Sequence, residues 1–321
     1  MNCSNCKKEF TRISRKEIKC PSCPFSVCKS CVSKQIMKNK SVEPCPSCNV
    51  PYQEASLKDI LSKTVFEIWK RNQEKIEKIR VIGSGGFGEC SLIKRGGKIL
   101  VMKEPLKREL ASFFSNEIHV HKLLDHQNIV PFYDSFIKRG KPHILLCPCI
   151  YGSLRDSLKN TTFSTKNKKN IIRQVITGLE YLLRMKVLHR DLKQGNILFD
   201  EKMNVRIGDF GLSIIAKDGK LFYRNCGTSR FKAPEILRRD GYSFEIDRWS
   251  LGVLMYYLFL GQYPFQGNDK NQIEQEILKH RFTFPTHATK EERECFEWIL
   301  NPNPKQRPTL EEMKTHPFLR M

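Results

Sequence analysis

One stretch constrains this chain more than any other: HRDLKQGN at residues 189–196, followed by GDFG at residues 208–211, which begins twelve positions after Asn196. Phosphoryl transfer requires a divalent cation that bridges phosphate groups, and Mg2+ prefers hard oxygen ligands. The side chains of Asn196 and Asp209 supply such oxygens. The Asp191 carboxylate can orient an attacking hydroxyl and accept its proton late in the step. The spacing therefore predicts a magnesium site for phosphoryl transfer.

A glycine-rich segment, GSGGFG at residues 83–88, lies upstream of this stretch. It is flanked by the strand-like runs IEKIRVI and ECSLI, so it predicts a hairpin that covers phosphates; a dinucleotide-binding turn would open a helix instead. The next strand-like run, KILVMK, ends at Lys103, and Glu117 follows fourteen residues later in a helical stretch. A lysine that orients phosphates needs an anionic partner, and we expect Glu117 to be that partner.

Together these motifs resemble those of the eukaryotic protein kinase family, from residue 76 to residue 320. The resemblance implies an α+β, bilobal kinase fold with a small β-rich N-lobe and a larger helical C-lobe. Lys193 after HRDL can neutralise charge on the transferred group. This lysine, and Gly227-Thr228 ahead of Ala233-Pro234-Glu235, are typical of serine/threonine kinases and not of tyrosine kinases. The expected substrates are therefore protein Ser or Thr hydroxyls.

Further assignments follow from the resemblance. Arg307 is implied to pair with Glu235, and residues 247–252 to begin a buried helix that anchors the catalytic loop. ATP with Mg2+ (or Mn2+) is the implied cofactor set. The implied catalytic residues are Asp191, Lys193, Lys103 and Glu117. The implied nucleotide-binding and magnesium-binding residues are Ile82, Gly83, Ser84, Gly85, Gly86, Phe87, Gly88, Cys90, Val101, Lys103, Leu146, Cys147, Cys149, Asn196 and Asp209, of which Asn196 and Asp209 hold magnesium.

Two positions of this implied nucleotide site depart from the family pattern. Cys90 stands where a valine usually covers the adenine ring, and Val101 replaces a small alanine. Both are apolar and compact, so ATP should still fit. Because the charged groups of Lys103, Asp191 and Asp209 are all present, a non-catalytic ATP-binding scaffold is the less favoured alternative.

The segment between GDFG and Ala233 bears on activation. Arg190 precedes the catalytic aspartate, and kinases with that arginine commonly use a phosphate on this segment to organise it. Two residues before Cys226, where many relatives carry a phosphorylated Thr, this chain has Arg224. We therefore predict activity without phosphorylation at that position. The fallback acceptors are Tyr223, Thr228 and Ser213.

Eight of the thirteen cysteines form four Cys-x-x-Cys pairs within residues 3–48. In a chain with no visible secretion signal, such pairs indicate two tetrahedral zinc sites, which would stabilise a domain too small to do so by burial alone. Spacing alone does not fix the pairing. In an interleaved cross-brace, one ion is bound by Cys3, Cys6, Cys28 and Cys31, and the other by Cys20, Cys23, Cys45 and Cys48.

This cross-brace resembles two families of zinc finger. The PCPSC ending at Cys48 and the helical run VSKQIMKN resemble a RING finger, which would bind a ubiquitin-conjugating enzyme. A FYVE-type finger shares the cysteine ladder and would bind a phosphoinositide. In a ubiquitin ligase Val32, Ile36 and Pro46 should form an exposed apolar patch, whereas Lys7 after Cys6 is unusual for one. The alternative is a finger that only recruits the kinase to a protein, a phosphoinositide or nucleic acid.

Composition changes divide the chain into three predicted zones: a RING-like finger at 1–51, a helical linker at 52–78 and a kinase domain at 79–320. Residues 55–78 lack Gly and Pro, and their apolar positions recur at helical spacing. We expect an amphipathic connector helix there, broken at most once, that packs its apolar stripe on a neighbour.

Charge and hydropathy bear on partners and location. Lys and Arg number 56 against 34 acidic residues, a net charge of +22, which favours acidic partners, although a solvated lysine-rich surface is a simpler explanation. The longest apolar run, residues 251–260, is too short to span a bilayer and predicts a buried helix. With no secretory signal at the N-terminus, we expect an intracellular protein, cytoplasmic or nuclear, that is not secreted and has no transmembrane segment.

Overall fold

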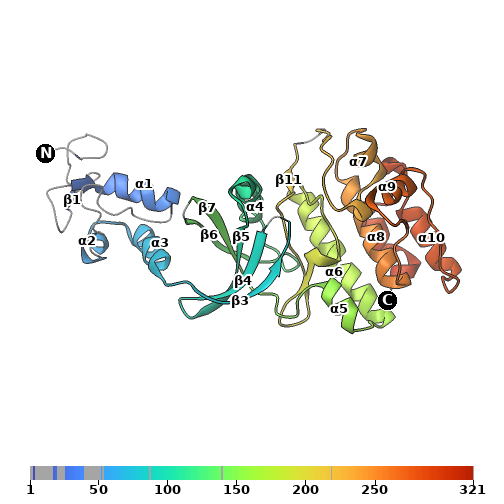
Figure 1. Cartoon of the computed structure of the whole chain (residues 1–321), viewed down its shortest axis with the longest axis horizontal. Coiled ribbons are helices and arrows are strands. Elements are labelled where there is room, and N and C mark those ends of the chain that lie inside the picture. Colours follow the sequence, from blue (N-terminus) through green and yellow to red (C-terminus); the bar gives the residue numbers. More distant parts are fainter. Residues whose placement is uncertain are drawn as a thin grey trace. The chain divides into compact units, whose positions relative to one another are not determined.

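The computed structural model describes residues 3, 17–19, 26–39, 52, 54–86, 88–138, 140–217 and 219–320. The chain divides into two compact units, one formed by residues 1–106 with 134–144 and the other by residues 107–133 with 145–321. Figure 1 shows the elements of both units in sequence colours.

The N-terminal part of the first unit is a short hairpin followed by helices. Strands β1 (Glu17–Lys19) and β2 (Ser26–Cys28) pair antiparallel, with Glu17 opposite Cys28. Helix α1 (Lys29–Asn39) begins directly after β2. The connector forms two helices, α2 (Glu54–Lys58) and α3 (Lys63–Gln73), so the expected single break is present. The helix ends earlier than the expected residue 78, because residues 77 and 78 already belong to a strand of the following sheet. Helix α3 packs against α1, which confirms that the connector buries its apolar stripe on a neighbour.

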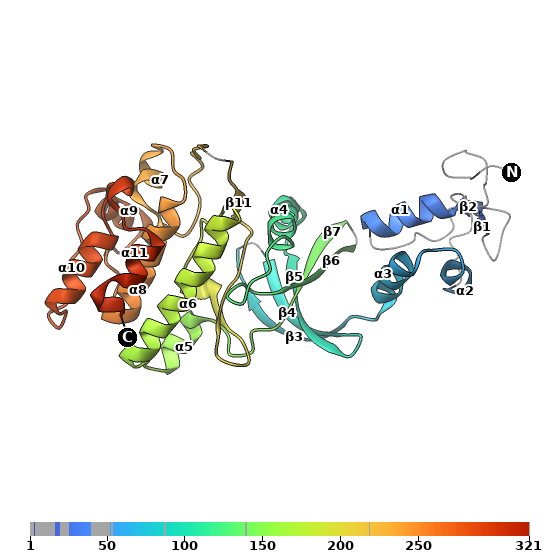
Figure 2. The ribbon, with the colours of Figure 1, turned by 180° about the vertical axis from the view of Figure 1, so that it is seen from behind.

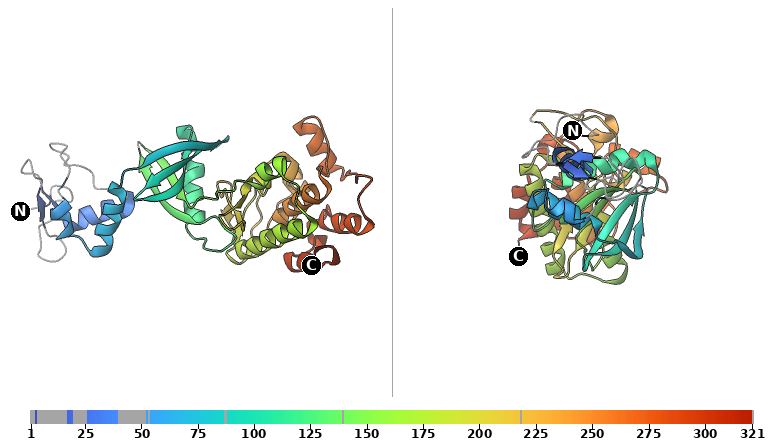
Figure 3. Two further views of the ribbon diagram at one scale, coloured as in Figure 1. Left: turned by 90° about the horizontal axis from the view of Figure 1, so that it is seen from below. Right: turned by 90° about the vertical axis from the view of Figure 1, so that its left-hand side faces the viewer.

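A five-stranded sheet, in which β3 and β4 and then β4 and β5 pair antiparallel, makes up most of the remainder of this unit. Its strands twist and curve together, as Figure 3 shows, in the order β3-β4-β5-β7-β6. The strands are β3 (Glu77–Ser84), β4 (Gly88–Arg95), β5 (Lys98–Pro105), β6 (Phe132–Lys138) and β7 (Lys141–Leu146). The predicted hairpin at residues 83–88 is therefore confirmed as the connection between β3 and β4.

The second unit is mainly helical. Its α-helices are α4 (Ala111–His121), α5 (Leu154–Asn160), α6 (Thr165–Arg184), α7 (Pro234–Arg238), α8 (Glu245–Leu260), α9 (Lys270–Leu278), α10 (Lys290–Ile299) and α11 (Leu310–Thr315). Short strands β8 (Val187–Leu188), β9 (Ile197–Phe199), β10 (Val205–Ile207) and β11 (Ile214–Ile215) pair as β8 with β11 and β9 with β10. Its 3-10 helices are η1 (Arg108–Leu110), η2 (Gln194–Asn196), η3 (Ser229–Phe231), η4 (Pro304–Gln306) and η5 (Pro317–Leu319).

Helix α8 lies in the core of this unit and contacts α6 and α10. In Figure 2, α6, α8 and α11 lie side by side, in agreement with their contacts. Twelve of the sixteen α8 residues are buried, which confirms the helix predicted from the apolar run at 251–260. Among the described residues, no helix combines the length and the apolar character needed to cross a membrane.

Candidate active site

The catalytic loop at residues 189–196 lies between β8 and β9, and hydrogen bonds to α8 fix its backbone. Asp247, near the start of α8, accepts the backbone N–H of His189 at 2.7 Å and that of Arg190 at 2.9 Å. Burial raises the pKa of the Asp247 carboxyl above its usual value, although His189 and these two N–H donors oppose the shift. The sequence prediction that this helix anchors the loop is therefore confirmed.

Asp191 sits in a network of charged and hydroxyl groups. Its Oδ1 accepts the backbone N–H of Thr228 at 3.0 Å and the Thr228 hydroxyl at 2.7 Å. Its Oδ2 pairs with Lys193 Nζ at 2.5 Å, and the same ammonium donates to Thr228 Oγ1 at 3.1 Å. The Asp191 carboxylate is thus held by Thr228, in the segment that leads to Ala233, and by the ammonium of Lys193.

The two predicted magnesium ligands, Asn196 and Asp209, belong to two segments that one backbone hydrogen bond joins. The Asn196 side-chain nitrogen donates to the Asp191 carbonyl at 2.8 Å, which leaves its amide oxygen to face a cation. The backbone N–H of Gly208 donates to the Asn196 carbonyl at 2.9 Å and joins the loop to GDFG. Asp209 takes the left-handed conformation, with φ of 67°. The side chains of Asn196 and Asp209 carry the hard oxygen donors that magnesium prefers, and their joint role as ligands stays a prediction.

Glu117 of α4 lies close to the same motif. A Cβ placed on Gly211 would be 3.4 Å from Glu117 Oε2 and 3.5 Å from Asp209 Oδ1, so both carboxylates border this glycine. The Glu117 side chain is buried, and Lys103 is buried on β5 in the other unit. The expected pairing of Lys103 with Glu117 stays a prediction.

Four aromatic and imidazole rings in the second unit contact one another in series and form a column. His121 lies 5.7 Å from Phe132 and 4.7 Å from Phe210, centroid to centroid, and Phe210 lies 5.2 Å from His189. Phe210 is fully buried. The column ties α4 to GDFG and to the catalytic loop, and so restrains the backbone that carries Asp209.

The sheet presents one half-exposed face on which predicted nucleotide contacts lie. Cys90 pairs with Lys103 across β4 and β5, and Leu92 pairs with Val101, so these four side chains share a face. The other face is buried, through Ser91, Ile93, Leu100 and Met102. In the preceding hairpin, the N–H of Gly85 donates to the Gly88 carbonyl at 3.0 Å.

The remaining predicted nucleotide contacts fall in three places. Ile82, Gly83 and Ser84 belong to β3, and Ile82 is exposed. Phe87 lies outside the described residues. Leu146 ends β7, and the N–H of Cys147 donates to the Pro131 carbonyl at 3.0 Å. Burial raises the pKa of the Cys149 thiol to about 12, so this thiol stays protonated.

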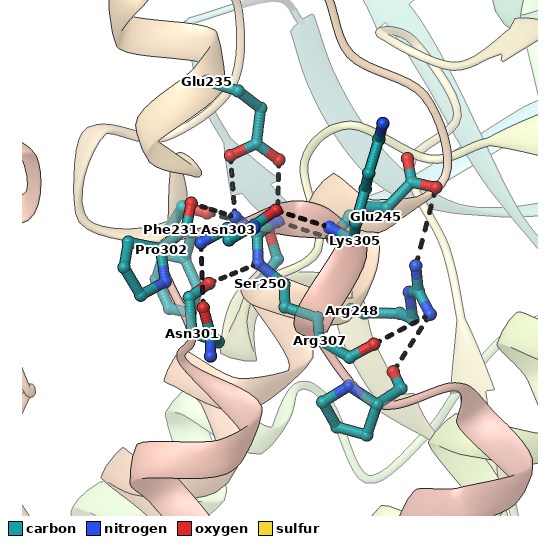
Figure 4. A network of polar contacts seen from close by, with 11 residues as sticks. Phe231, Glu235, Glu245, Arg248, Ser250, Asn301, Pro302, Asn303, Lys305 and Arg307 are labelled. Atoms are coloured by element: carbon teal, nitrogen blue, oxygen red, sulfur yellow. Dashed lines mark hydrogen bonds and ion pairs between the residues drawn. The ribbon is translucent and has the colours of Figure 1, made fainter.

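The segment after GDFG ends at a buried ion pair, drawn in Figure 4. Arg307 donates from Nη1 to Glu235 Oε1 at 2.7 Å and from Nη2 to Oε2 at 2.8 Å. The pairing implied by the family resemblance is therefore confirmed. Nearby, the Ser250 hydroxyl of α8 donates to the Phe231 carbonyl at 2.8 Å. Both contacts fix the end of the segment to the helical core.

The three fallback phosphate acceptors lie in different environments. Ser213 is fully buried, and its hydroxyl donates to the His189 carbonyl at 3.1 Å. Thr228 already contacts Asp191 and Lys193. Tyr223 has 58% of its surface exposed, so among these three only its hydroxyl is open to a modifying enzyme.

Sequence reasoning missed Asn116 and Tyr242 as groups that hold this segment. Asn116 of α4 donates from Nδ2 to the carbonyls of Ser213 at 2.8 Å and Gly211 at 3.4 Å. Tyr242 hydrogen-bonds with Arg190 and with the Arg224 carbonyl. No sequence motif signals either residue, because the contacts form only when distant segments meet.

The proposed zinc ligands are only partly described. Cys3 is fully buried and Cys31 is half-buried, and both belong to one apolar cluster with Val32 and Ile36. Cys28 ends β2. Across the described part of the chain, no group of three or more His, Cys, Asp or Glu side chains forms a metal site. The remaining proposed ligands, Cys6, Cys20, Cys23, Cys45 and Cys48, lie outside the described residues.

A sheet-bearing N-lobe, a helical C-lobe and a catalytic loop that holds Asp191 beside Lys193 are the features of a phosphoryl-transfer enzyme of the protein kinase class. Comparison with known families agrees, since the protein kinase domain matches residues 76–319. The chain belongs to the protein kinase family.

Curated relatives narrow the class further. A probable cell cycle serine/threonine-protein kinase CDC5 homolog of Encephalitozoon cuniculi (strain GB-M1) is 37% identical over 252 residues, or 75% of this chain and 53% of that protein. The Saccharomyces cerevisiae (strain ATCC 204508 / S288c) cell cycle serine/threonine-protein kinase CDC5/MSD2 is 36% identical over 81% of this chain and 39% of that protein. Drosophila melanogaster serine/threonine-protein kinase polo is 34% identical over 78% and 45%. The kinase domain is thus of the serine/threonine, Polo/CDC5 type, and the chain spans about half of these relatives or less.

Proposed function

We propose that this chain is a serine/threonine protein kinase that uses ATP and magnesium to phosphorylate protein hydroxyls. The observation that carries the proposal is the position of Asp191. The two residues before it, His189 and Arg190, donate their backbone N–H groups to Asp247, its own N–H donates to His189 Nδ1, and its carboxylate contacts Lys193 and Thr228. A base held in this way can align a hydroxyl without first having to reorganise.

Each residue has a distinct part in the proposed reaction. Asp191 orients the substrate hydroxyl and takes its proton, and Lys193 offsets charge on the transferred group. Asn196 and Asp209 would hold magnesium, which neutralises charge on the phosphates when it is bound. Lys103, paired with Glu117, would orient the α- and β-phosphates beneath the hairpin at residues 83–88.

The glycines of that hairpin support the nucleotide assignment. A Cβ placed on Gly83, Gly85 or Gly86 would meet no protein atom within 4 Å. Packing inside the protein therefore does not require glycine at these three positions. Close approach of the backbone to a bound phosphate does require it.

Lys103→Met tests the nucleotide assignment. We expect it to abolish phosphotransfer to a protein substrate and to leave the unfolding temperature nearly unchanged, because the change removes a charge and keeps most of the volume. Lys94→Met, at an exposed position on the neighbouring strand β4, is the matched control and should retain wild-type activity. Wild-type rates in Lys103→Met would show that the lysine has been misassigned.

We further propose that the N-terminal segment is a zinc finger that recruits the kinase to a partner. In the interleaved cross-brace that we propose, Cys3 and Cys31 would share one ion, and both lie at the same apolar cluster. A ubiquitin ligase would need Val32 and Ile36 on an exposed patch, and both are buried, while Pro46 lies outside the described residues. Their burial favours recruitment over ligase activity.

A ubiquitin-transfer assay separates these two roles. The zinc-loaded protein is combined with activating enzyme, a panel of conjugating enzymes, ATP and ubiquitin, with Cys28→Ser as the comparison. Recruitment alone predicts no ubiquitin chains with any conjugating enzyme. Chains that disappear in Cys28→Ser would instead establish a ligase module.

A further inference from the structure

Arg190, the residue before the catalytic Asp191, is buried, and its guanidinium donates to two neutral acceptors. It donates from Nε to the Leu212 carbonyl at 2.7 Å and from Nη1 to the Tyr242 hydroxyl at 3.2 Å. Within the described residues its guanidinium forms no ion pair. A buried cation normally requires an anion or a full set of acceptors, so the groups that contact Arg190 determine where it rests.

Tyr242 connects this cation to the segment that follows GDFG. Its hydroxyl accepts from Arg190 and donates to the Arg224 carbonyl at 2.8 Å. The backbone of Tyr242 is fixed by a two-bond bridge with Phe222, in which each N–H donates to the other carbonyl at 2.9 Å. Burial raises the pKa of the Tyr242 hydroxyl to about 12, so it stays protonated and able to donate.

Arg224 extends the connection to α4. Its Cζ lies 5.5 Å from the ring centroid of Phe113, the geometry of a cation–π contact. Asn116, on the same helix, donates to the Ser213 and Gly211 carbonyls. The segment is thus attached to α4 near its start, at Gly211 and Ser213, and again at Arg224, and it is attached to the catalytic loop through Tyr242.

We propose that Tyr242 is a positioning residue that takes the place of an activating phosphate. Its hydroxyl links Arg190 to the backbone of residue 224, the position where the sequence has Arg in place of a phosphorylated hydroxyl. The catalytic arrangement around Asp191 is thereby held in the unmodified protein. The inference rests on the proposed kinase function and adds that this kinase needs no modification of the segment.

The test compares the full-length wild type with Tyr242→Phe after phosphatase treatment, with intact mass confirming that no phosphate remains. Tyr223→Phe is the matched control, because it removes an exposed hydroxyl from the same segment. We expect the treated wild type and Tyr223→Phe to keep the kcat of the untreated enzyme. Tyr242→Phe should lower kcat about tenfold or more, the size expected for losing a hydrogen bond to a charged group. Its KM for ATP should not change, since Tyr242 is placed to act through Arg190; a general loss of folded protein would instead lower the active fraction and the melting temperature.

Two results would overturn the inference alone. One is a phosphatase-treated wild type that is inactive and regains activity when the segment is phosphorylated, which does not depend on whether the variant folds. The other is a Tyr242→Phe enzyme with wild-type kcat. An absence of phosphotransfer in every phosphorylation state would overturn the proposed function, and this inference with it.

Discussion

Arg307 and Glu235, 72 residues apart in sequence, form a bidentate ion pair whose side chains are 0% and 4% exposed. The Arg307 guanidinium also lies 4.9 Å from the Trp249 ring centroid and donates from Nε to the Asn301 carbonyl at 2.8 Å. The pair therefore joins the end of the segment that follows GDFG to α8 and to the loop after α10. Because the charges are removed from water, the geometry must satisfy nearly every donor.

Breaking this pair should strongly destabilise the helical unit. Glu235→Gln leaves a buried guanidinium without its anion, and we expect a loss of about 3–5 kcal/mol in the free energy of unfolding. Denaturant unfolding followed by fluorescence measures it. The exposed pair Lys290–Glu294 on α10, with side chains 90% and 63% exposed, is the matched control. Lys290→Met should cost less than about 1 kcal/mol. Equal losses in the two variants would contradict the role assigned to Arg307–Glu235.

Glycine should be required at position 227 for two reasons, namely its positive φ and its close approach to the catalytic loop. Its φ is 96°, and a Cβ there would lie 2.6 Å from the Arg190 carbonyl oxygen. We expect Gly227→Ala to lower kcat about 100-fold, as displacements near 1 Å do in active sites. Gly219, in the same segment, also has a positive φ of 71° but would meet no atom within 4 Å. Steady-state kinetics of Gly219→Ala should show little change, and a comparable loss there would mean that backbone strain alone is responsible.

His126 should make stability depend on pH near neutrality. Burial, and then the charges of Arg184 and Arg206, hold the pKa of His126 below its ordinary 6.5. Its Nδ1 accepts the N–H of Asn128 at 3.1 Å, and its ring stacks on Tyr181 at 4.7 Å. Because the folded pKa is lowered, the stabilising contribution is present above pH 6.5 and is lost as pH falls through the folded pKa.

Thermal unfolding between pH 7 and pH 5 measures this effect. His126→Gln should give a shallower decline in melting temperature than the wild type. The exposed His119→Gln should follow the wild-type curve and serves as the control. Identical curves for His126→Gln and the wild type would show that this imidazole does not contribute.

Zinc content tests the proposed finger and its pairing together. Metal analysis of the purified protein should give two zinc ions per chain. In the interleaved arrangement, Cys3→Ser/Cys31→Ser removes ligands from one site and should leave one ion. If neighbouring pairs shared an ion instead, the same double variant would lose both. Cys149→Ser in the hinge is the control and should keep two ions, whereas a wild type without zinc would contradict the finger itself.

The sequence predicts the chemical roles of the site residues more fully than it predicts the contacts that hold those residues in place. Roles for Asn196, Asp209 and Asp191 can be predicted because magnesium and a hydroxyl proton require particular oxygen donors at set spacing, and these roles stay predictions. The pair Arg307–Glu235 and the buried helix at 251–260 followed from family resemblance and from apolar run length. All of these signals are local in sequence or belong to a known pattern.

What the sequence left open depends on contacts between distant segments. The hydroxyl of Tyr242 reaches Arg190 only because residues 222 and 242 pair across the fold. The sequence allows Ser213 as a phosphate acceptor, whereas packing buries its hydroxyl against the His189 carbonyl. The sequence likewise does not indicate whether Val32 and Ile36 face solvent. The packing of α3 against α1 determines that they are buried.

Phosphate transfer by the purified chain tests the central claim most directly. The wild type and Asp191→Asn are incubated with magnesium, γ-labelled ATP and a protein substrate, and the labelled amino acids are then identified. The account predicts phosphoserine or phosphothreonine in the wild type and a rate at least about 100-fold lower in Asp191→Asn, the contribution of a positioned base. Equal rates in the two proteins, or label confined to tyrosine, would contradict it.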